Sequence, residues 1–362
     1  MPFQSTLQYF SLQSFPDHYR QGCELWERAL LSQTLPFTRL DFTLPSQDNL
    51  LCQTGWIGDL NAEAVLVVIG GTHGIEGFTG TAVQVDWMQM VANGLIALPD
   101  HTAMLMINAL NPWGYANNRR CDDQGIDVNR NFIDFSQPLP VNPGYEELQP
   151  LFGICDRDAR VKAIEDYCLR VGQRPYEIAL SGGQFNDPAG PFYGGQRPGF
   201  SRGVVESLIR HYSLANRRLA VVDVHTGLGP YSYGEVICDH PLGTDGLMTA
   251  IKWFGPGCGL PSIGKSSSVP KLGLLDYAWH QVMGSKSCFV TLEFGTLGTA
   301  ALFDTLIDEA SVWSGSECAS CHSKEVVAEQ MKAHFYPLDD YWREAVIFRA
   351  RQVLHQALVG VS

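Results

Sequence analysis

The sequence predicts an α/β fold, built on a mixed, mostly parallel twisted sheet with helices on both faces. Four short runs are dense in β-branched and aliphatic residues and show no alternation, as is typical of strands buried on both faces. Segments of helical character separate several of these runs, which favours strands joined through helices. The runs are residues 64–69, 103–109, 219–224 and 288–292, and the helical segments are residues 79–92, 158–171 and 202–216.

Two further helices are expected at the ends of the chain. Residues 16–34 carry apolar side chains at near-helical spacing, and Asp339 or Asp340 can cap a helix over residues 339–359. The 362 residues contain no charge run or Pro/Gly/Ser tract long enough to be a linker. We therefore expect a single domain over residues 1–362, with both helices packed on it.

Composition excludes several classes of protein. A formal charge of −13 without a basic cluster disfavours nucleic-acid binding. The longest apolar run, residues 64–71, falls short of the roughly 18 residues that would cross a bilayer. The first 20 residues do not resemble an export signal, so we expect a cytoplasmic protein whose ten cysteines are reduced thiols.

Polar side chains follow each of the four predicted strands. His73 and Glu76 come after the first, Asn111 after the second, His225 after the third and Glu293 after the fourth. Ligands of open α/β sheets bind beyond the carboxyl ends of the strands. The sequence therefore predicts that these side chains converge on one site.

Three of these residues form a candidate metal centre. His73 and Glu76 lie three apart in a glycine-rich turn, and His225 would complete a set of two imidazoles and one carboxylate with a position left open. Imidazole ligands favour one Zn²⁺ per chain over calcium or magnesium, while iron in a facial triad stays open. Alone, a His-x-x-Glu pair is more often a surface feature, and a lone His225 more often a buried histidine bonded to a backbone carbonyl.

Five motifs together resemble the zinc carboxypeptidase superfamily, in a poorly characterised bacterial branch. The resemblance covers roughly residues 64–132 and 219–296, and it implies the superfamily's fold. Its most specific element is the Asp-x-Asn-Arg-Asn-Phe run at residues 127–132. The motifs are His73-x-x-Glu76, Asn111-Pro112-x-Gly114-Tyr115, Arg120 with Gly125 to Phe132, Asp223-Val224-His225 and Thr291-Leu292-Glu293.

The resemblance implies a role for five further residues. Glu293 would be the general base for a zinc-activated water, and Arg120 would stabilise the oxyanion, with the adjacent Arg119 as the alternative. Asn129 and Arg130 would hold a terminal carboxylate of the substrate, and Asp127 would orient a zinc-binding histidine, here His73. The structural alternatives are a capping role for Glu293, a turn residue at Asn129 and a solvated Arg130.

The implied activity is a zinc-dependent hydrolase that cleaves an amide (peptide) bond near a free carboxylate. The alternatives are an N-acyl amino acid deacylase of the aspartoacylase or succinylglutamate desuccinylase type and a non-catalytic metal-binding module. The expected partner is a small peptide or an N-acyl amino acid, and the oligomeric state is left open. The superfamily's gating tyrosine has four candidates, Tyr193, Tyr231, Tyr233 and Tyr277.

A separate motif stands near the end of the chain. Cys318-Ala319-Ser320-Cys321-His322 has the spacing of a c-type haem attachment site, which requires export. A redox dithiol or an accessory zinc site that includes His334 is a better interpretation. A solvent-exposed insertion loop is the leading one.

Overall fold

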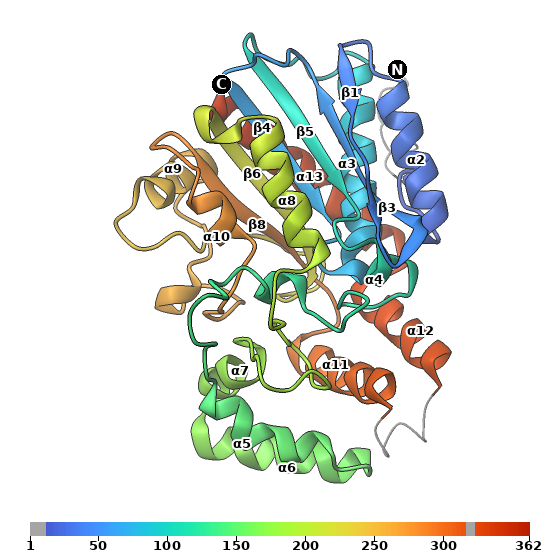
Figure 1. Ribbon diagram of the computed structural model, residues 1–362, viewed down its shortest axis with the longest axis vertical. Coiled ribbons are helices and arrows are strands. Elements are labelled where there is room, and N and C mark those ends of the chain that lie inside the picture. The colour runs from blue at the N-terminus through green and yellow to red at the C-terminus, as the bar shows by residue number, and fades with distance from the viewer. Residues whose placement is uncertain (1–11, 316–322) are drawn as a thin grey trace.

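A computed structural model describes residues 12–315 and 323–362 (Figure 1). Its sheet has eight strands in the order β1-β3-β5-β4-β6-β8-β7, with β2 paired to β3. The strands are β1 (Phe37–Arg39), β2 (Phe42–Leu44), β3 (Gln47–Ile57), β4 (Ala64–Gly70), β5 (Thr102–Asn108), β6 (Arg218–Gly227), β7 (Gly234–Ile237) and β8 (Cys288–Gly295).

The strand directions confirm the mixed, mostly parallel sheet. Strands β5, β4, β6 and β8 are neighbours and pair in parallel. Strand β3 runs antiparallel to β5, β1 and β2, and β7 runs antiparallel to β8. Only β3 and β7 of the described strands therefore run against the rest, and the four predicted strands form the parallel centre.

Helices cover both faces of this sheet, as predicted. The helices of the described residues are α2 (Tyr19–Leu31), α3 (Gly77–Ala92), α4 (Pro112–Ala116), α5 (Pro143–Phe152), α6 (Arg157–Val171), α7 (Gln173–Ser181), α8 (Phe200–His211), α9 (Asp245–Phe254), α10 (Asp276–His280), α11 (Thr299–Ser314), α12 (Lys324–Phe335) and α13 (Asp340–Val361). Short 3-10 helices are η1 (Gly74–Glu76), η2 (Val128–Arg130), η3 (Leu214–Asn216) and η4 (Pro261–Ile263). In Figure 1, α8 lies in front of the sheet, α13 lies behind it, and α5, α6 and α7 form a group below it.

Two apolar cores, one on each face, explain the unbroken apolar runs of the central strands. In β4, Leu66 and Val68 pack into a core that includes residues of α2, α3 and α13. The intervening Val65 and Val67 pack into the core beneath α8 and α10. Both faces of the strand are thus buried, so an alternating pattern is absent.

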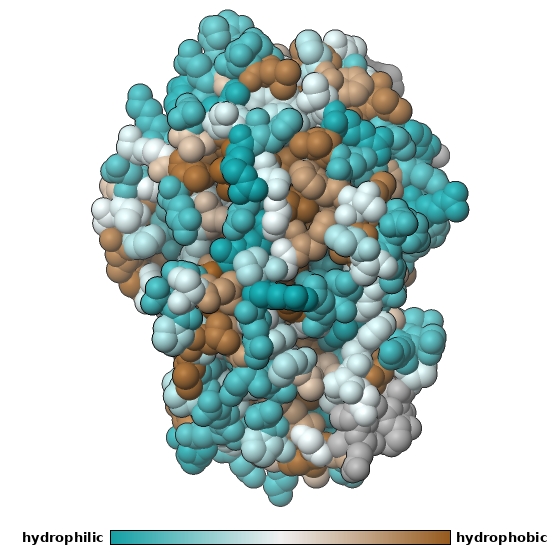
Figure 2. Space-filling model, in the orientation of Figure 1, coloured by the Kyte–Doolittle hydropathy of each residue, from teal (hydrophilic) through white to brown (hydrophobic). Residues whose placement is uncertain are grey.

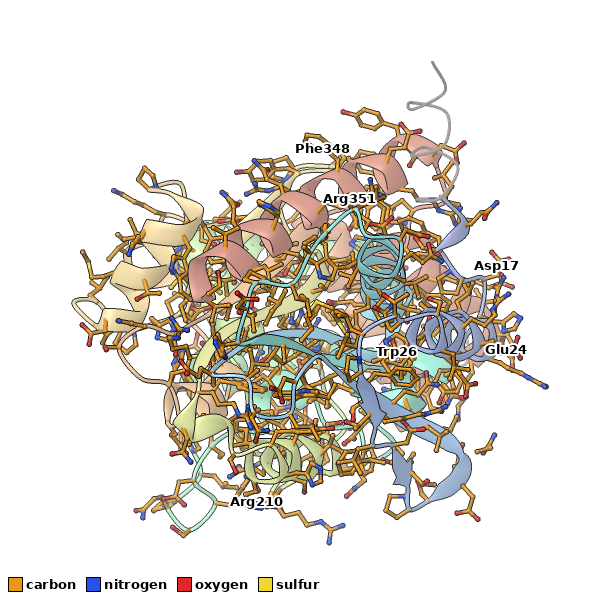
Figure 3. The ribbon with its side chains drawn as sticks, turned by 90° about the horizontal axis from the view of Figure 1, so that it is seen from above. Asp17, Glu24, Trp26, Arg210, Phe348 and Arg351 are labelled. Carbon is orange, nitrogen blue, oxygen red and sulfur yellow. The ribbon has the colours of Figure 1, made fainter. Side chains whose placement is uncertain are left out.

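The two terminal helices lie where the sequence predicts them. Helix α2 buries Trp26, and α13 begins after Asp339, whose carboxylate accepts a hydrogen bond from the Trp342 amide at 3.0 Å. Arg351 of α13, which is labelled in Figure 3, forms an ion pair with Asp86 of α3 at 2.6 Å. These contacts fix α13 against α3, the helix that follows the glycine-rich turn after β4.

The face in Figure 2 mixes hydrophilic residues with scattered hydrophobic ones. None of the described helices is both long and apolar enough to cross a bilayer. Of the eight cysteines among the described residues, seven are free thiols and Cys155 is disulfide-bonded, so the expectation of ten reduced thiols is wrong there. The Cys318 to His322 motif lies outside the described residues, and a cytoplasmic location stays a prediction.

Candidate metal centre

The first two candidate ligands sit in a tight turn between β4 and α3. Gly71 adopts a φ of +74°, and a side chain on Gly74 would place its Cβ 2.2 Å from the backbone carbon of Gly114. The amides of Gly74 and Ile75 bond to the carbonyls of Arg120 and Arg119, at 3.1 and 2.7 Å. The glycines therefore let the turn approach α4 and dock the Arg119–Arg120 segment beside it.

The third candidate ligand, His225, comes from β6, the parallel neighbour of β4. His73, Glu76 and His225 are each at most 3% exposed. One ligand atom from each lies within 4.8 Å of the other two, and no other such group of three occurs in residues 12–315 and 323–362. The structure thus brings together the three residues that the sequence singles out.

Hydrogen bonds orient His225 and Glu76. His225 Nε2 lies 2.6 Å from Asp223 Oδ2, and its Nδ1 lies 3.1 Å from Glu76 Oε2. Asp223 also accepts a bond from the Thr72 hydroxyl at 2.9 Å. Sequence reasoning assigned Asp223 no role, although its position two residues before His225 on one strand places both side chains on the same face.

The contacts of His73 come from the segment that follows α4. Its Nδ1 lies 3.3 Å from Asp127 Oδ1 without a directed hydrogen bond, and its Nε2 lies 2.8 Å from Arg120 Nη2. Arg120 Nε in turn donates to Asp127 Oδ2 at 3.0 Å, and Nη1 lies 3.4 Å from Glu76 Oε1. Asp127 and Arg120 therefore both touch His73, and Arg120 also touches Glu76.

The protonation of the three candidate ligands follows from burial and neighbouring charge. Burial, aided by Arg120, lowers the pKa of His73 to about 4, so its imidazole is neutral. Burial opposes the charged form of His225, but Asp223 and Glu76 outweigh it and raise the pKa. Burial also opposes the charged form of Glu76, but the two histidines and Arg120 lower its pKa overall.

This donor set fits a zinc ion. Zinc binds neutral imidazole nitrogens and carboxylate oxygens, and a catalytic site supplies three protein ligands. Here two imidazoles and one carboxylate meet in a buried place. The ion-pair network that holds His225 positive would favour a cation in place of its proton.

Glu293 lies on β8 directly across the ladder from His225. Glu293 lines a pocket that is also lined by His73, Glu76 and His225. Its Oε1 accepts a hydrogen bond from the Leu228 amide at 3.0 Å. Burial, and then the charge of Glu76, raises its pKa to about 7. A carboxylate with that pKa beside the candidate metal ligands can both take up and release a proton near neutral pH.

The two adjacent arginines point to different surroundings. Arg120 lines the pocket, whereas Arg119 pairs with the buried Glu309 of α11. The Arg119 guanidinium also lies over the rings of Trp113 and Trp313, at 5.6 and 4.5 Å from their centres. Of the two candidates for the oxyanion role, the structure places Arg120 at the site.

Asn129 and Arg130 also line the pocket, but both make bonds to the backbone. Asn129 Oδ1 accepts from the Leu275 amide at 2.7 Å. Arg130 is fully buried and donates to the Ser181 carbonyl at 2.8 Å from Nη2, so the alternative of a solvated arginine is wrong. Their side chains are thus held rigidly in the pocket wall.

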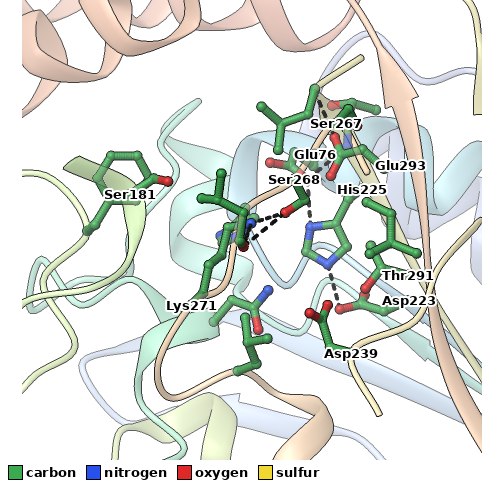
Figure 4. A pocket seen from close by; sticks show the side chains of 18 of the residues that line it. Glu76, Ser181, Asp223, His225, Asp239, Ser267, Ser268, Lys271, Thr291 and Glu293 are labelled. Carbon is green, nitrogen blue, oxygen red and sulfur yellow. Dashed lines mark hydrogen bonds and ion pairs between the residues drawn. The ribbon is translucent and has the colours of Figure 1, made fainter. Parts of the chain in front are cut away.

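The pocket contains polar residues that sequence reasoning did not single out (Figure 4). Most come from loops, and Asp276 is the first residue of the short helix α10, so neither an apolar run nor a periodic pattern marks them. None of the four tyrosine candidates is among the described residues that line the pocket. The missed residues include Asp239, Ser267, Ser268, Lys271 and Asp276.

Comparison with known families matches residues 36–349 to DUF2817, described as "Protein of unknown function". The chain belongs to this family. A search of curated proteins finds no match. The region matched to DUF2817, residues 36–349, includes all of the candidate site residues discussed above.

Solved structures similar to this DUF2817 chain include metallocarboxypeptidases and succinylglutamate desuccinylases. Bovine thrombin-activatable fibrinolysis inhibitor, solved with tick carboxypeptidase inhibitor, is 12% identical with a TM-score of 0.49, covering 90% of this chain and 97% of that one. The Pseudomonas aeruginosa metallo-carboxypeptidase is 13% identical with a TM-score of 0.41 (91% and 69% covered). The Chromobacterium violaceum succinylglutamate desuccinylase is 13% identical with a TM-score of 0.39 (87% and 74% covered).

Proposed function

We propose that this protein is a zinc-dependent hydrolase that cleaves an amide bond near a free carboxylate, in the manner of a metallocarboxypeptidase. One observation carries the proposal. The buried side chains of His73, Glu76 and His225 converge within 4.8 Å, and Glu293 lies across the strand ladder from His225 in the same pocket. Metal ligands beside a carboxylate of raised pKa are the parts that metal-assisted hydrolysis requires.

His73, Glu76 and His225 would hold the ion. A zinc ion bound there would supply a Lewis acid that acidifies water and polarises a carbonyl. Asp223 would keep the His225 ring in place through Nε2, and Asp127 would do the same for His73. Such supporting carboxylates fix ring orientation and raise the basicity of the ligand.

Glu293 would move the proton during hydrolysis. Its carboxylate takes the proton of the attacking water and delivers it to the nitrogen of the leaving amine. The Leu228 amide holds Oε1, so the Glu293 side chain is already in a fixed position before the reaction begins. A pKa raised by burial makes both steps possible near neutral pH.

Positive charge at the pocket would serve the substrate and the transition state. Arg120 lies beside Glu76 and His73, where a cation can stabilise the negative charge that develops on the carbonyl oxygen. Asn129 and Arg130, fixed in the wall by backbone contacts, would bind the free carboxylate. Because these side chains are already rigid, they lose little conformational freedom when the substrate binds.

The same wall would also suit an N-acyl amino acid, because that substrate too carries a free carboxylate beside the amide. Peptides with a free carboxyl end and N-acyl amino acids, both offered to the zinc-loaded protein, separate the two activities. Release of a terminal amino acid from peptides supports the peptidase. Hydrolysis confined to N-acyl amino acids supports the deacylase.

Glu293→Gln tests the proposed mechanism. We expect its turnover to fall by roughly 100-fold or more while zinc binding is retained, because the amide cannot take up the proton. The matched control is Glu63→Gln, an exposed position outside the pocket. Turnover that survives in Glu293→Gln would refute Glu293 as the base, and no turnover on any substrate would favour a non-catalytic metal-binding module.

A further inference from the structure

One wall of the pocket is acidic and contains an acceptor without a partner. Asp239 and Asp276 both line it. Asp276 is 3% exposed, and its Oδ1 has no hydrogen-bond partner in the described residues. Burial and the nearby Asp239 raise its pKa. Two carboxyl groups that disfavour each other's ionisation, one with an unpartnered oxygen, form a surface that would be stabilised by a cation.

Another part of the same pocket presents a cation, Lys271. Lys271 is half-buried as a residue, and its ammonium donates to Ser268 Oγ and to the Val269 carbonyl, as Figure 4 shows for Ser268. Burial and the charge of Arg130 lower its pKa to about 8, which leaves it charged at neutral pH. An ammonium has three donors, so Lys271 retains one for a ligand.

The loop that carries Lys271 is clamped to the sheet. Glu235 of β7 accepts a bond from the Ser267 amide at 3.1 Å and another from the Ser267 hydroxyl. Gly259 is packed so closely that a Cβ there would lie 2.0 Å from Glu235 Oε1. Glu235 also faces Glu293 across the ladder, so the clamp sits beside the proposed base. Lys271 is therefore presented to the pocket from a fixed position.

The two charges share the pocket without neutralising each other. Lys271 and Asp239 influence each other's pKa, yet no ion pair within 4.0 Å joins them in the described part of the chain. We propose that the part of the pocket lined by Asp239, Asp276 and Lys271 recognises a leaving residue whose side chain carries both an ammonium and a carboxylate group. This proposal rests on the hydrolase function proposed above. Asp239 and Asp276 contact the ammonium, and Lys271 contacts the carboxylate.

Selectivity follows from the cost of a buried charge without a partner. A lysine side chain would satisfy the acidic wall but bring its cation near Lys271, and a glutamate side chain would do the reverse. A zwitterionic side chain pairs with both. Sites built around buried polar groups reject analogues that leave one of those groups unpaired, typically by large factors.

The test uses four acyl-tripeptides that differ only in the last residue: alanine, lysine, glutamate or 2,6-diaminopimelate. With the zinc-loaded full chain we expect kcat/KM to be highest for diaminopimelate, by about tenfold or more over each of the other three. The same four residues as N-acyl amino acids extend the test to the deacylase activity. Equal rates for diaminopimelate and alanine would overturn the proposal.

Two variants separate the two contacts. Asp239→Asn should lower kcat/KM for the lysine and diaminopimelate substrates, whereas Lys271→Met should lower it for glutamate and diaminopimelate, each by about tenfold. Asp245→Asn and Lys252→Met, both exposed and outside the pocket, are the matched controls. Equal losses on all four substrates in either pocket variant would indicate a merely structural role and contradict the assignment.

A binding measurement keeps the proposal distinct from the proposed hydrolysis. Calorimetric titration of zinc-loaded Glu293→Gln with free 2,6-diaminopimelate, lysine and glutamate requires no turnover. Binding of diaminopimelate about tenfold tighter than the other two would support the subsite even if no substrate were hydrolysed. Equal affinities, or no binding of any of the three, would overturn it even if peptide hydrolysis were found.

Discussion

At the scale of single residues, His225 is held through both ring nitrogens. Asp223 contacts Nε2 at 2.6 Å and Glu76 contacts Nδ1 at 3.1 Å. A ring fixed in this way loses little freedom when it binds a metal ion, and the carboxylate on the far nitrogen increases its basicity. The sequence could identify the ligand, but not the hydrogen bonds that orient it.

Asp223→Ala should weaken zinc binding without removing it. We expect the zinc dissociation constant to rise about 10-fold to 100-fold, because the ligand loses its supporting carboxylate. Competition with a chromogenic chelator measures this change, with Thr72→Val as a milder companion because Thr72 touches only Asp223 in the ligand network. An unaltered dissociation constant in Asp223→Ala would show that the contact does not support the metal.

Asp122 offers a pH-dependent test of the turn that leads to Asp127. Its Oδ1 accepts bonds from the Gln124 and Ile126 amides, both at 2.9 Å, but burial raises its pKa to about 7. The unfolded chain ionises this group near pH 4, so between about pH 4 and 7 the folded state binds more protons. Stability from this group is therefore lost as pH rises through that window.

Asp122→Asn keeps the accepting oxygen and removes the charge. We expect the variant and the parent to be similarly stable near pH 4, and the variant to become more stable by up to a few kcal/mol above about pH 7. Urea unfolding across this range measures the difference. A difference that did not grow with pH, or that favoured the parent at high pH, would contradict the buried charge.

At the scale of elements, the carboxyl ends of parallel strands bring the site together. The sequence revealed this part well, because β4, β5, β6 and β8 are buried runs followed by polar residues. It did not reveal β3, whose first three residues are exposed, or β7, which has only four residues. Strands that are short, or that begin with exposed polar residues, lack the apolar signal that identifies a buried strand.

The loop residues of the pocket could not be predicted from the sequence, for a related reason. Lys271 and Asp239 do not belong to a helix or strand, so no periodicity marks them. Their position in the pocket depends on long-range contacts, such as Glu235 with Ser267. Contacts between segments distant in sequence are determined by the tertiary fold, and local pattern carries little information about them.

Breaking the ion pair between Arg119 and Glu309 tests whether that pair stabilises the segment that carries Arg120. Arg119→Met should destabilise the fold by about 3–5 kcal/mol, because it leaves Glu309 buried without its cation. Adding Glu309→Leu should restore much of that loss. Denaturant unfolding of both variants and of Arg120→Met measures the effect, and activity per folded molecule should fall most in Arg120→Met. A double variant no more stable than Arg119→Met would contradict this account.

At the scale of the whole molecule, the candidate site depends on most of the chain. Its residues span positions 73 to 293, and four strands from the sheet centre deliver or flank them. The cores on both faces, including α2 and α13, fix those strands. The sequence predicted this architecture, while the single domain over residues 1–362 stays a prediction.

The metal content of the purified protein tests the central claim most directly. Plasma mass spectrometry would compare the unmodified chain with His73→Ala, His225→Ala and the control His355→Ala, which replaces an exposed histidine of α13. The account predicts about one zinc per chain, lost in the first two variants and retained in the control, because removing one of three ligands leaves too few to hold the ion. The absence of zinc from the unmodified chain, or a zinc content that is unchanged in His73→Ala and His225→Ala, would contradict the account.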